Sequence, residues 1–147
     1  MGMTVVLDRM IHTEAVHEEL GKKIGLEGCC SFGGTGRDLN PIDLMAMGLA
    51  SCLQIVMAKA AQGKGLDVTG TWAETSYTMK NYKIETFDIV IHSPLNPSAD
   101  DQALLEKESH RCPVYLAVKD SVKVNVSFEW ATQATPKAAA ACSACCG

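Results

Sequence analysis

The feature that most constrains the fold is a long helical pattern that begins at Asn40-Pro41 and ends near Gly63. Asparagine can cap the free amide groups at a helix start, and proline at the first helical position loses no hydrogen bond. Apolar residues then recur at helical spacing over about five turns. This stripe contains Leu44, Met45, Gly48, Leu49, Cys52, Ile55, Val56, Lys59 and Ala60. Because the opposite face is also rich in Ala and Met, the pattern predicts a central helix that is buried nearly all round.

Segments before and after this helix have the alternating, β-branched character of strands. Residues 4–12 and 15–30 predict a short antiparallel meander. Residues 68–79 and 82–92 predict a hairpin, with Lys80-Asn81 as its tight turn.

The last third of the chain predicts two shorter helices and a closing strand. Residues 98–109 begin with a serine cap followed by acids, which favours a helix. Residues 112–119 open with Cys-Pro and predict a short helix, and residues 123–130 predict a strand. The order of strands, helix, strands, helices and strand indicates an α+β class. We expect one domain over residues 1–131 and a flexible Ala/Cys-rich tail over residues 132–147.

Size and charge exclude several classes of function. The chain has 147 residues, a formal net charge of −4 and no Lys/Arg-rich run, which argues against nucleic acid as a partner. No apolar stretch is expected to reach the roughly 18 residues that a membrane span needs. The N-terminus lacks the basic start and long apolar segment of a secretion signal. We therefore expect a cytoplasmic protein that contacts no membrane.

Two of the seven cysteines are placed for redox chemistry. Cys52 lies on the apolar face of the predicted central helix, three turns from its N-terminus, where the helix dipole has faded. Cys112 precedes Pro113 and is expected near a helix N-cap, where exposed amides can lower a thiol pKa. Sequence alone therefore predicts that Cys112 is the more acidic thiol.

The other five cysteines allow simpler interpretations. Cys29 and Cys30 are adjacent, and their simplest interpretation is packing at a strand end. The C-terminal cluster of Cys142, Cys145 and Cys146 has a spacing that suits a soft metal or a redox shuttle. A disordered tail is the alternative for this cluster, because a four-ligand zinc site would need a further partner.

Two motifs in order resemble the OsmC/Ohr family over residues 4–130. The first motif has a Gly-rich segment, Gly33-Gly34-Thr35-Gly36. It is followed by Asn40-Pro41 at the helix start and by Ala50-Ser51-Cys52 within the helix. Cys112-Pro113-Val114 follows 60 residues after Cys52 (112 − 52), with a predicted hairpin between the two thiols. The resemblance implies an OsmC-like fold, in which two small antiparallel sheets surround a long central helix in an intertwined homodimer.

The same resemblance implies a thiol peroxidase that reduces organic hydroperoxides with a dithiol reductant, at sites on the subunit interface. Cys52 would be the peroxidatic thiol and Cys112 the resolving thiol. Neither a metal nor another cofactor is expected. The alternative on the same fold is a non-catalytic protein that binds a small apolar ligand.

The electrostatic support of the thiols departs from the family pattern. Ile42 stands where peroxidase members have a Glu that holds an active-site Arg. Asp43 is the next residue, but one helical step turns a side chain by roughly 100°, so it could simply be a favourable first-turn acid. Arg9 and Arg37 are the candidates for the active-site Arg, with a surface charge as the alternative for each.

Near the second thiol, Arg111 could lower the pKa of Cys112. His110 could carry protons or could simply end its helix. A hydroperoxide with an organic tail also needs an apolar pocket. The candidate lining residues are Met45, Met47, Leu49, Leu53, Val114 and Tyr115, for which ordinary core packing is the alternative.

Overall fold

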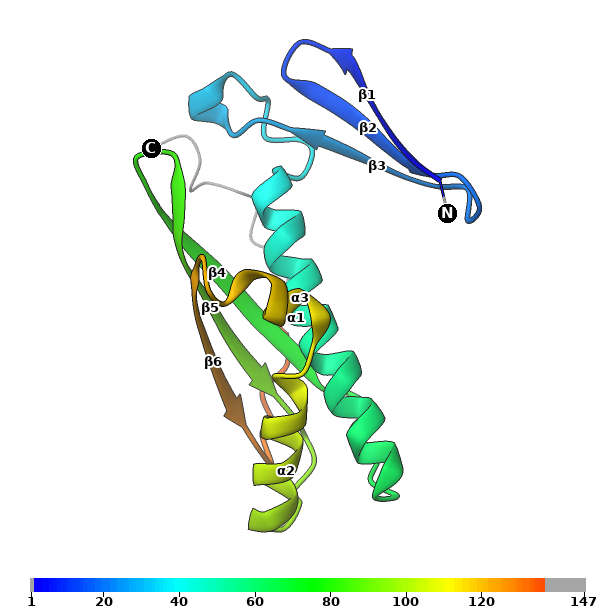
Figure 1. Cartoon of the computed structure of the whole chain (residues 1–147), viewed down its shortest axis with the longest axis vertical. Helices are drawn as coiled ribbons and strands as arrows, with labels where there is room; N and C mark the ends of the chain where they lie inside the picture. Colours follow the sequence, from blue (N-terminus) through cyan, green and yellow to red (C-terminus); the bar gives the residue numbers. More distant parts are fainter. Residues whose placement is uncertain (1, 137–147) are drawn as a thin grey trace. The chain divides into compact units, whose positions relative to one another are not determined.

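The computed structural model describes residues 2–136, so the predicted tail beyond Pro136, with its three cysteines, lies outside the described residues. The described chain forms two compact units, one ending at Met45 and one running from Ala46 to Pro136 (Figure 1). The strands and helices follow one another in the predicted order, and the predicted α+β class is confirmed.

The first unit contains a three-stranded antiparallel sheet. Its strands β1 (Met3–Arg9), β2 (His12–His17) and β3 (Lys22–Glu27) follow one another in space as in sequence, which confirms the meander. Every residue of β1 is exposed. Among the described residues of this unit, Leu26 is the one buried hydrophobic side chain. This sheet therefore has almost no core in a single chain.

The predicted long helix is confirmed as α1 (Pro41–Gly63). The side-chain Oδ1 of Asn40 accepts a hydrogen bond from the Ile42 amide at 2.9 Å, and the Asn40 amide donates to Asp43 Oδ2 at 3.1 Å. These reciprocal bonds satisfy backbone groups that the first helical turn leaves without partners. Asn40 and Asp43 thus cap the helix together.

In the single chain, the buried face of α1 is not the predicted stripe, and the helix is not buried on every side. Its buried residues are Ala46, Leu49, Ala50, Leu53, Met57 and Ala61. This face shares only Leu49 with the predicted stripe, and Ile55 in that stripe is 65% exposed in the single chain. Because the helix is apolar on every side, its periodicity cannot identify the face that the core covers.

The apolar composition of α1 also bears on the expectation that no segment is long and apolar enough to span a membrane. By length and composition, α1 could cross a membrane, which the sequence had been expected to exclude. The central helix of a soluble protein meets the same criterion, and a third of the relevant window is already buried in the chain. This property is therefore weak grounds for a membrane span.

The second unit contains a mixed three-stranded sheet with two short helices. Its strands are β4 (Trp72–Lys80), β5 (Lys83–His92) and β6 (Lys123–Glu129), in that order. The hairpin turn lies at Asn81-Tyr82, one residue later than predicted, and both residues have positive φ angles, 51° and 61°.

Helices α2 (Ala99–Ser109) and α3 (Pro113–Val118) confirm the two predicted short helices. They connect β5 to β6, and this crossover lets β6 run parallel to β5. The expectation of two small antiparallel sheets therefore holds for β4 and β5 of the second sheet but is wrong for β6. The core of the unit includes apolar side chains with at most 1% exposure from α1, β5 and α2: Leu49, Leu53, Met57, Ala61, Phe87, Ile89, Ile91 and Leu105.

Candidate functional site

Cys52 and Cys112 meet in the second unit. Cys52 lies three full turns into α1 and is partly buried, whereas Cys112 is the N-cap of α3 and is fully buried. Neither forms a disulfide, and their side chains hydrogen-bond to each other. The fold thus brings together two thiols that lie 60 residues apart in sequence.

The predicted acidity of Cys112 is wrong. Burial raises the pKa of the Cys112 thiol, and the hydrogen bond with Cys52 raises it further. The Tyr115 amide does donate to Cys112 Sγ at 3.4 Å, and it lowers the pKa as expected for an N-cap. Desolvation of the thiolate outweighs this donor. Cys112 therefore keeps its proton at neutral pH and can donate it to the Cys52 sulfur.

The polar residues beside Cys112 have other partners. Arg111 is largely exposed and pairs with Glu108 at 3.1 Å. His110 Nδ1 lies 2.7 Å from the Glu106 carbonyl oxygen, to which it donates, and its ring makes an edge contact with Tyr115 at 4.9 Å. His110 is the C-cap of α2, as the structural alternative predicted.

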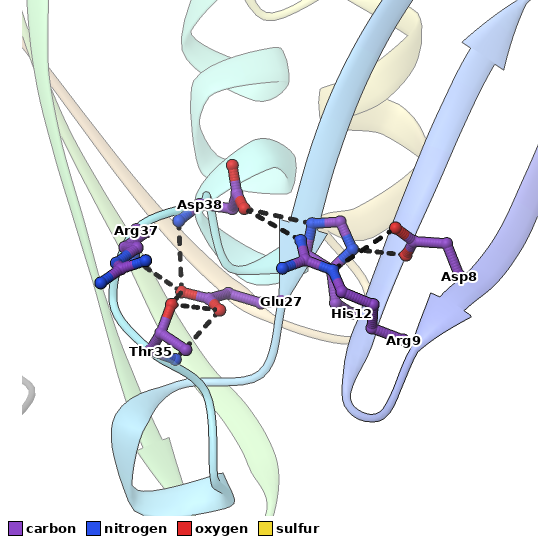
Figure 2. Close-up of polar contacts among 7 residues, drawn as sticks. All are labelled: Asp8, Arg9, His12, Glu27, Thr35, Arg37 and Asp38. Atoms are coloured by element: carbon purple, nitrogen blue, oxygen red, sulfur yellow. Dashed lines mark hydrogen bonds and ion pairs between the residues drawn. The ribbon is translucent and has the colours of Figure 1, made fainter.

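The two candidate arginines belong to the first unit (Figure 2). The Arg9 guanidinium lies 3.5 Å from an Asp8 oxygen and 4.0 Å from an Asp38 oxygen. The Arg37 backbone amide donates to Glu27 at 2.7 Å. Asp43, the third supporting candidate, serves the helix cap described above.

The residues proposed to line an apolar pocket differ widely in exposure. Leu49 and Leu53 are fully buried in the core, whereas Met45, Met47 and Val114 are 38–49% exposed. Met47 lines a shallow cavity of about 370 Å³ whose other lining residues are Ala50, Ser51, Gln54, Ile55, Ala73 and Thr75. A larger groove of about 770 Å³ runs between the C-terminal half of α1 and residues 65–71.

A polar cluster in the first unit has no counterpart in the sequence predictions. Glu27, at the end of β3, is 6% exposed. Its carboxylate accepts hydrogen bonds from the amide and hydroxyl of Thr35 and from the amides of Arg37 and Asp38, at 2.7–3.2 Å. The Thr35 amide bond, with the others, lowers the pKa of Glu27 to about 2. Glu27 therefore closes the Gly-rich loop, and the glycines were the available signal that the backbone turns tightly here.

Replacing Glu27 by glutamine is expected to lower the melting temperature at neutral pH, because a charged acceptor of four donors is lost. A depressed carboxyl pKa contributes stability above its unfolded value of 4.5, and this stability is lost as the pH falls toward about 2. The difference between wild type and Glu27→Gln should therefore shrink below about pH 4.5. Calorimetric scans across this range check the prediction, and a constant difference would contradict it.

No cluster of three or more His, Cys, Asp or Glu side chains suited to a metal ion occurs within residues 2–136. Cys142, Cys145 and Cys146, for which a metal site was considered, lie outside the described residues.

Comparison with known proteins identifies a family whose sequence pattern this chain matches. The model of the family described as OsmC-like protein matches residues 34–127, which include both thiols. The comparison with curated proteins gives no match.

Several solved structures are similar to the chain, and each covers 88% of it. An osmotic stress induced and detoxification response protein from Psychrobacter arcticus is 22% identical with a TM-score of 0.83, over 96% of its own chain. The organic hydroperoxide resistance protein OsmC from Legionella pneumophila is 18% identical with a TM-score of 0.69, over 97% of its chain. The organic hydroperoxide resistance protein OhrB from Bacillus subtilis is 16% identical with a TM-score of 0.64, over 98%. At these identities the structural likeness shows the fold. Together with the family match across more than half of the sequence, it shows that the chain belongs to the OsmC-like protein family.

Proposed function

We propose that the protein is a thiol-dependent peroxidase that reduces organic hydroperoxides and serves in peroxide defence. The observation that carries the proposal is the hydrogen-bonded pair of Cys52 and Cys112 in their reduced form. Family membership and the organic hydroperoxide resistance proteins among its structural relatives support a role in peroxide defence.

The proposed reaction has three steps. The Cys52 thiolate attacks the O–O bond, and with one proton this gives a Cys52 sulfenic acid and the alcohol of the hydroperoxide. The Cys112 sulfur then attacks the sulfenic sulfur, which forms the Cys52–Cys112 disulfide and releases water. A dithiol reductant restores both thiols by exchange and is itself oxidised to a disulfide.

The different surroundings of the two thiols support these roles. Cys52 is only partly buried, so a hydroperoxide can approach it, whereas Cys112 is 0% exposed. The raised pKa of Cys112 keeps that thiol protonated. A protonated Cys112 can donate its S–H to the Cys52 sulfur, and it attacks only after Cys52 has been oxidised.

We further propose that the protein works as a homodimer in the cytoplasm. The first unit exposes apolar side chains from both faces of β1, including Val5 at 63% and Val6 at 51%. Such a sheet requires a cover, and a second copy of the chain is the cover that the family resemblance implies. Sedimentation equilibrium distinguishes this dimer from a 15.7 kDa monomer.

A second candidate function is the binding of a small apolar ligand without catalysis. Ile42 favours it, because the residue after Asn40-Pro41 cannot hold an arginine as a carboxylate would. In that case the Cys52→Ser variant would bind an apolar probe as the wild type does, and neither protein would consume hydroperoxide.

The proposal is tested by mixing the reduced full-length protein with cumene hydroperoxide and excess dihydrolipoamide. We expect repeated turnover, measured as loss of hydroperoxide above the rate of a protein-free blank. A rate equal to the blank would contradict peroxidase activity with this substrate class and favour the binding function.

A further inference from the structure

A buried histidine in the first unit lies between two aspartates (Figure 2). His12, at the start of β2, is 8% exposed. Its Nδ1 lies 2.5 Å from Asp8 Oδ1 on β1, and its Nε2 lies 3.1 Å from Asp38 Oδ2 in the loop that leads to α1. The ring therefore joins the sheet to the Gly-rich loop.

The close approach of these groups depends on a glycine in the neighbouring strand. A Cβ atom on Gly25 would lie 2.9 Å from Asp38 Oδ1 and 3.1 Å from His12 Nε2. Since both contacts are tighter than ordinary van der Waals distances, a side chain at this position would push the aspartate and the histidine apart. The lack of a side chain at Gly25 thus leaves the space that Asp38 and His12 need to meet.

The chemistry of imidazole sets the charge that this junction needs. A neutral imidazole has one N–H and one lone pair, so one of its nitrogens would present a lone pair to a carboxylate. Only the imidazolium ion donates from both nitrogens, to Asp8 and to Asp38. Histidine is also the side chain whose charge changes nearest to neutral pH.

We infer that His12 is a protonation-dependent clasp that ties the Asp38 side chain to the β1–β3 sheet when its ring is charged and releases this aspartate when its ring is neutral. This clasp acts independently of the proposed peroxidase activity. Its effect would reach α1 through the chain itself, because Asp38 is separated from the helix cap Asn40 by one residue.

The other charges around the ring are consistent with this role. Asp8 and Arg9 face it from β1, and Arg9 also pairs with both aspartates, at 3.5 Å and 4.0 Å. Glu27 is the register partner of His12 on β3, but its carboxylate is engaged by the loop amides. The hydrogen bond from His12 lowers the pKa of Asp8. The acidic limit of the clasp therefore lies below the usual Asp value of 3.8, because Asp8 must stay ionised to accept from the ring.

The test is amide hydrogen exchange of the full-length protein from about pH 6 to about pH 9, corrected for the intrinsic rate. Arg37 and Asp38 are the amides to follow. In the wild type we expect their protection to fall about tenfold or more as the pH rises. The variant His12→Gln should lack this pH step, because glutamine does not titrate. The matched control His17→Gln, on the same strand, should retain it.

A second measurement does not depend on any variant folding. The ring ¹⁵N shifts of His12 should report an imidazolium at about pH 6, and the Arg37 and Asp38 amide shifts should change at the same midpoint as the ring. A neutral ring at that pH would overturn the inference, as would loop amides that do not follow the His12 titration. Equal pH profiles for wild type and His12→Gln would also overturn it.

Discussion

Replacing Cys52 by serine should abolish hydroperoxide consumption, with a loss of at least about a thousand-fold in turnover. The reason is chemical, because a serine hydroxyl stays protonated at neutral pH and cannot attack the O–O bond as a thiolate does. Initial rates with cumene hydroperoxide and dihydrolipoamide measure the effect. A Cys52→Ser variant that keeps more than a tenth of wild-type turnover would contradict the assigned role.

Two matched variants separate the attacking thiol from the other thiols. Cys29→Ser removes a partly exposed thiol in the first unit and should leave turnover near the wild-type value. Cys112→Ser should still reduce about one equivalent of hydroperoxide per chain and then stop, with Cys52 held as a sulfenic acid that a dimedone label detects. If Cys52→Ser instead consumed about one equivalent of hydroperoxide and Cys112→Ser consumed none, Cys112 would be the attacking thiol and Cys52 the resolving thiol.

Replacing Leu53 by alanine should lower the free energy of unfolding by about 2–5 kcal/mol. Leu53 is 0% exposed, so its loss removes buried apolar surface and leaves a cavity that the core fills only in part. Urea unfolding measures the change. A loss below about 1 kcal/mol would show that Leu53 lines an open pocket, as its sequence position first suggested, and does not belong to the core.

The control for this variant lies on the same helix. Ile55 is 65% exposed in the single chain, so Ile55→Ala should cost about 1 kcal/mol or less in an isolated chain. A larger loss that grows as the protein is diluted would show that a second copy covers this face of α1.

Local signals in the sequence predicted which elements form. Asn40-Pro41, the serine at position 98 and Cys112-Pro113 each mark a helix start, and all three starts are found in the structure. Capping and turn chemistry involve residues close in sequence, which is why such signals can be read directly. The hairpin turn differed by one residue, because Asn81 and Tyr82 both adopt positive φ angles, and tyrosine gives no sign that it will do so.

Properties that depend on distant residues could not be read in this way. The pKa of Cys112 is decided by burial, which local sequence does not report, so the N-cap argument gave the wrong direction. The burial of α1 was misassigned because all its faces are apolar. The junction of Asp8, His12 and Asp38 joins two strands and a loop, and no spacing rule connects these three positions.

The proposed redox pair can be examined by disulfide mapping. Reduced protein is treated with one equivalent of cumene hydroperoxide, the remaining thiols are blocked, and peptides are mapped by mass spectrometry. We predict a Cys52–Cys112 disulfide in most chains, formed together with the loss of the hydroperoxide. If the hydroperoxide is consumed while Cys52 and Cys112 remain reduced, or if Cys52 pairs with a different cysteine, the two thiols are not the redox pair.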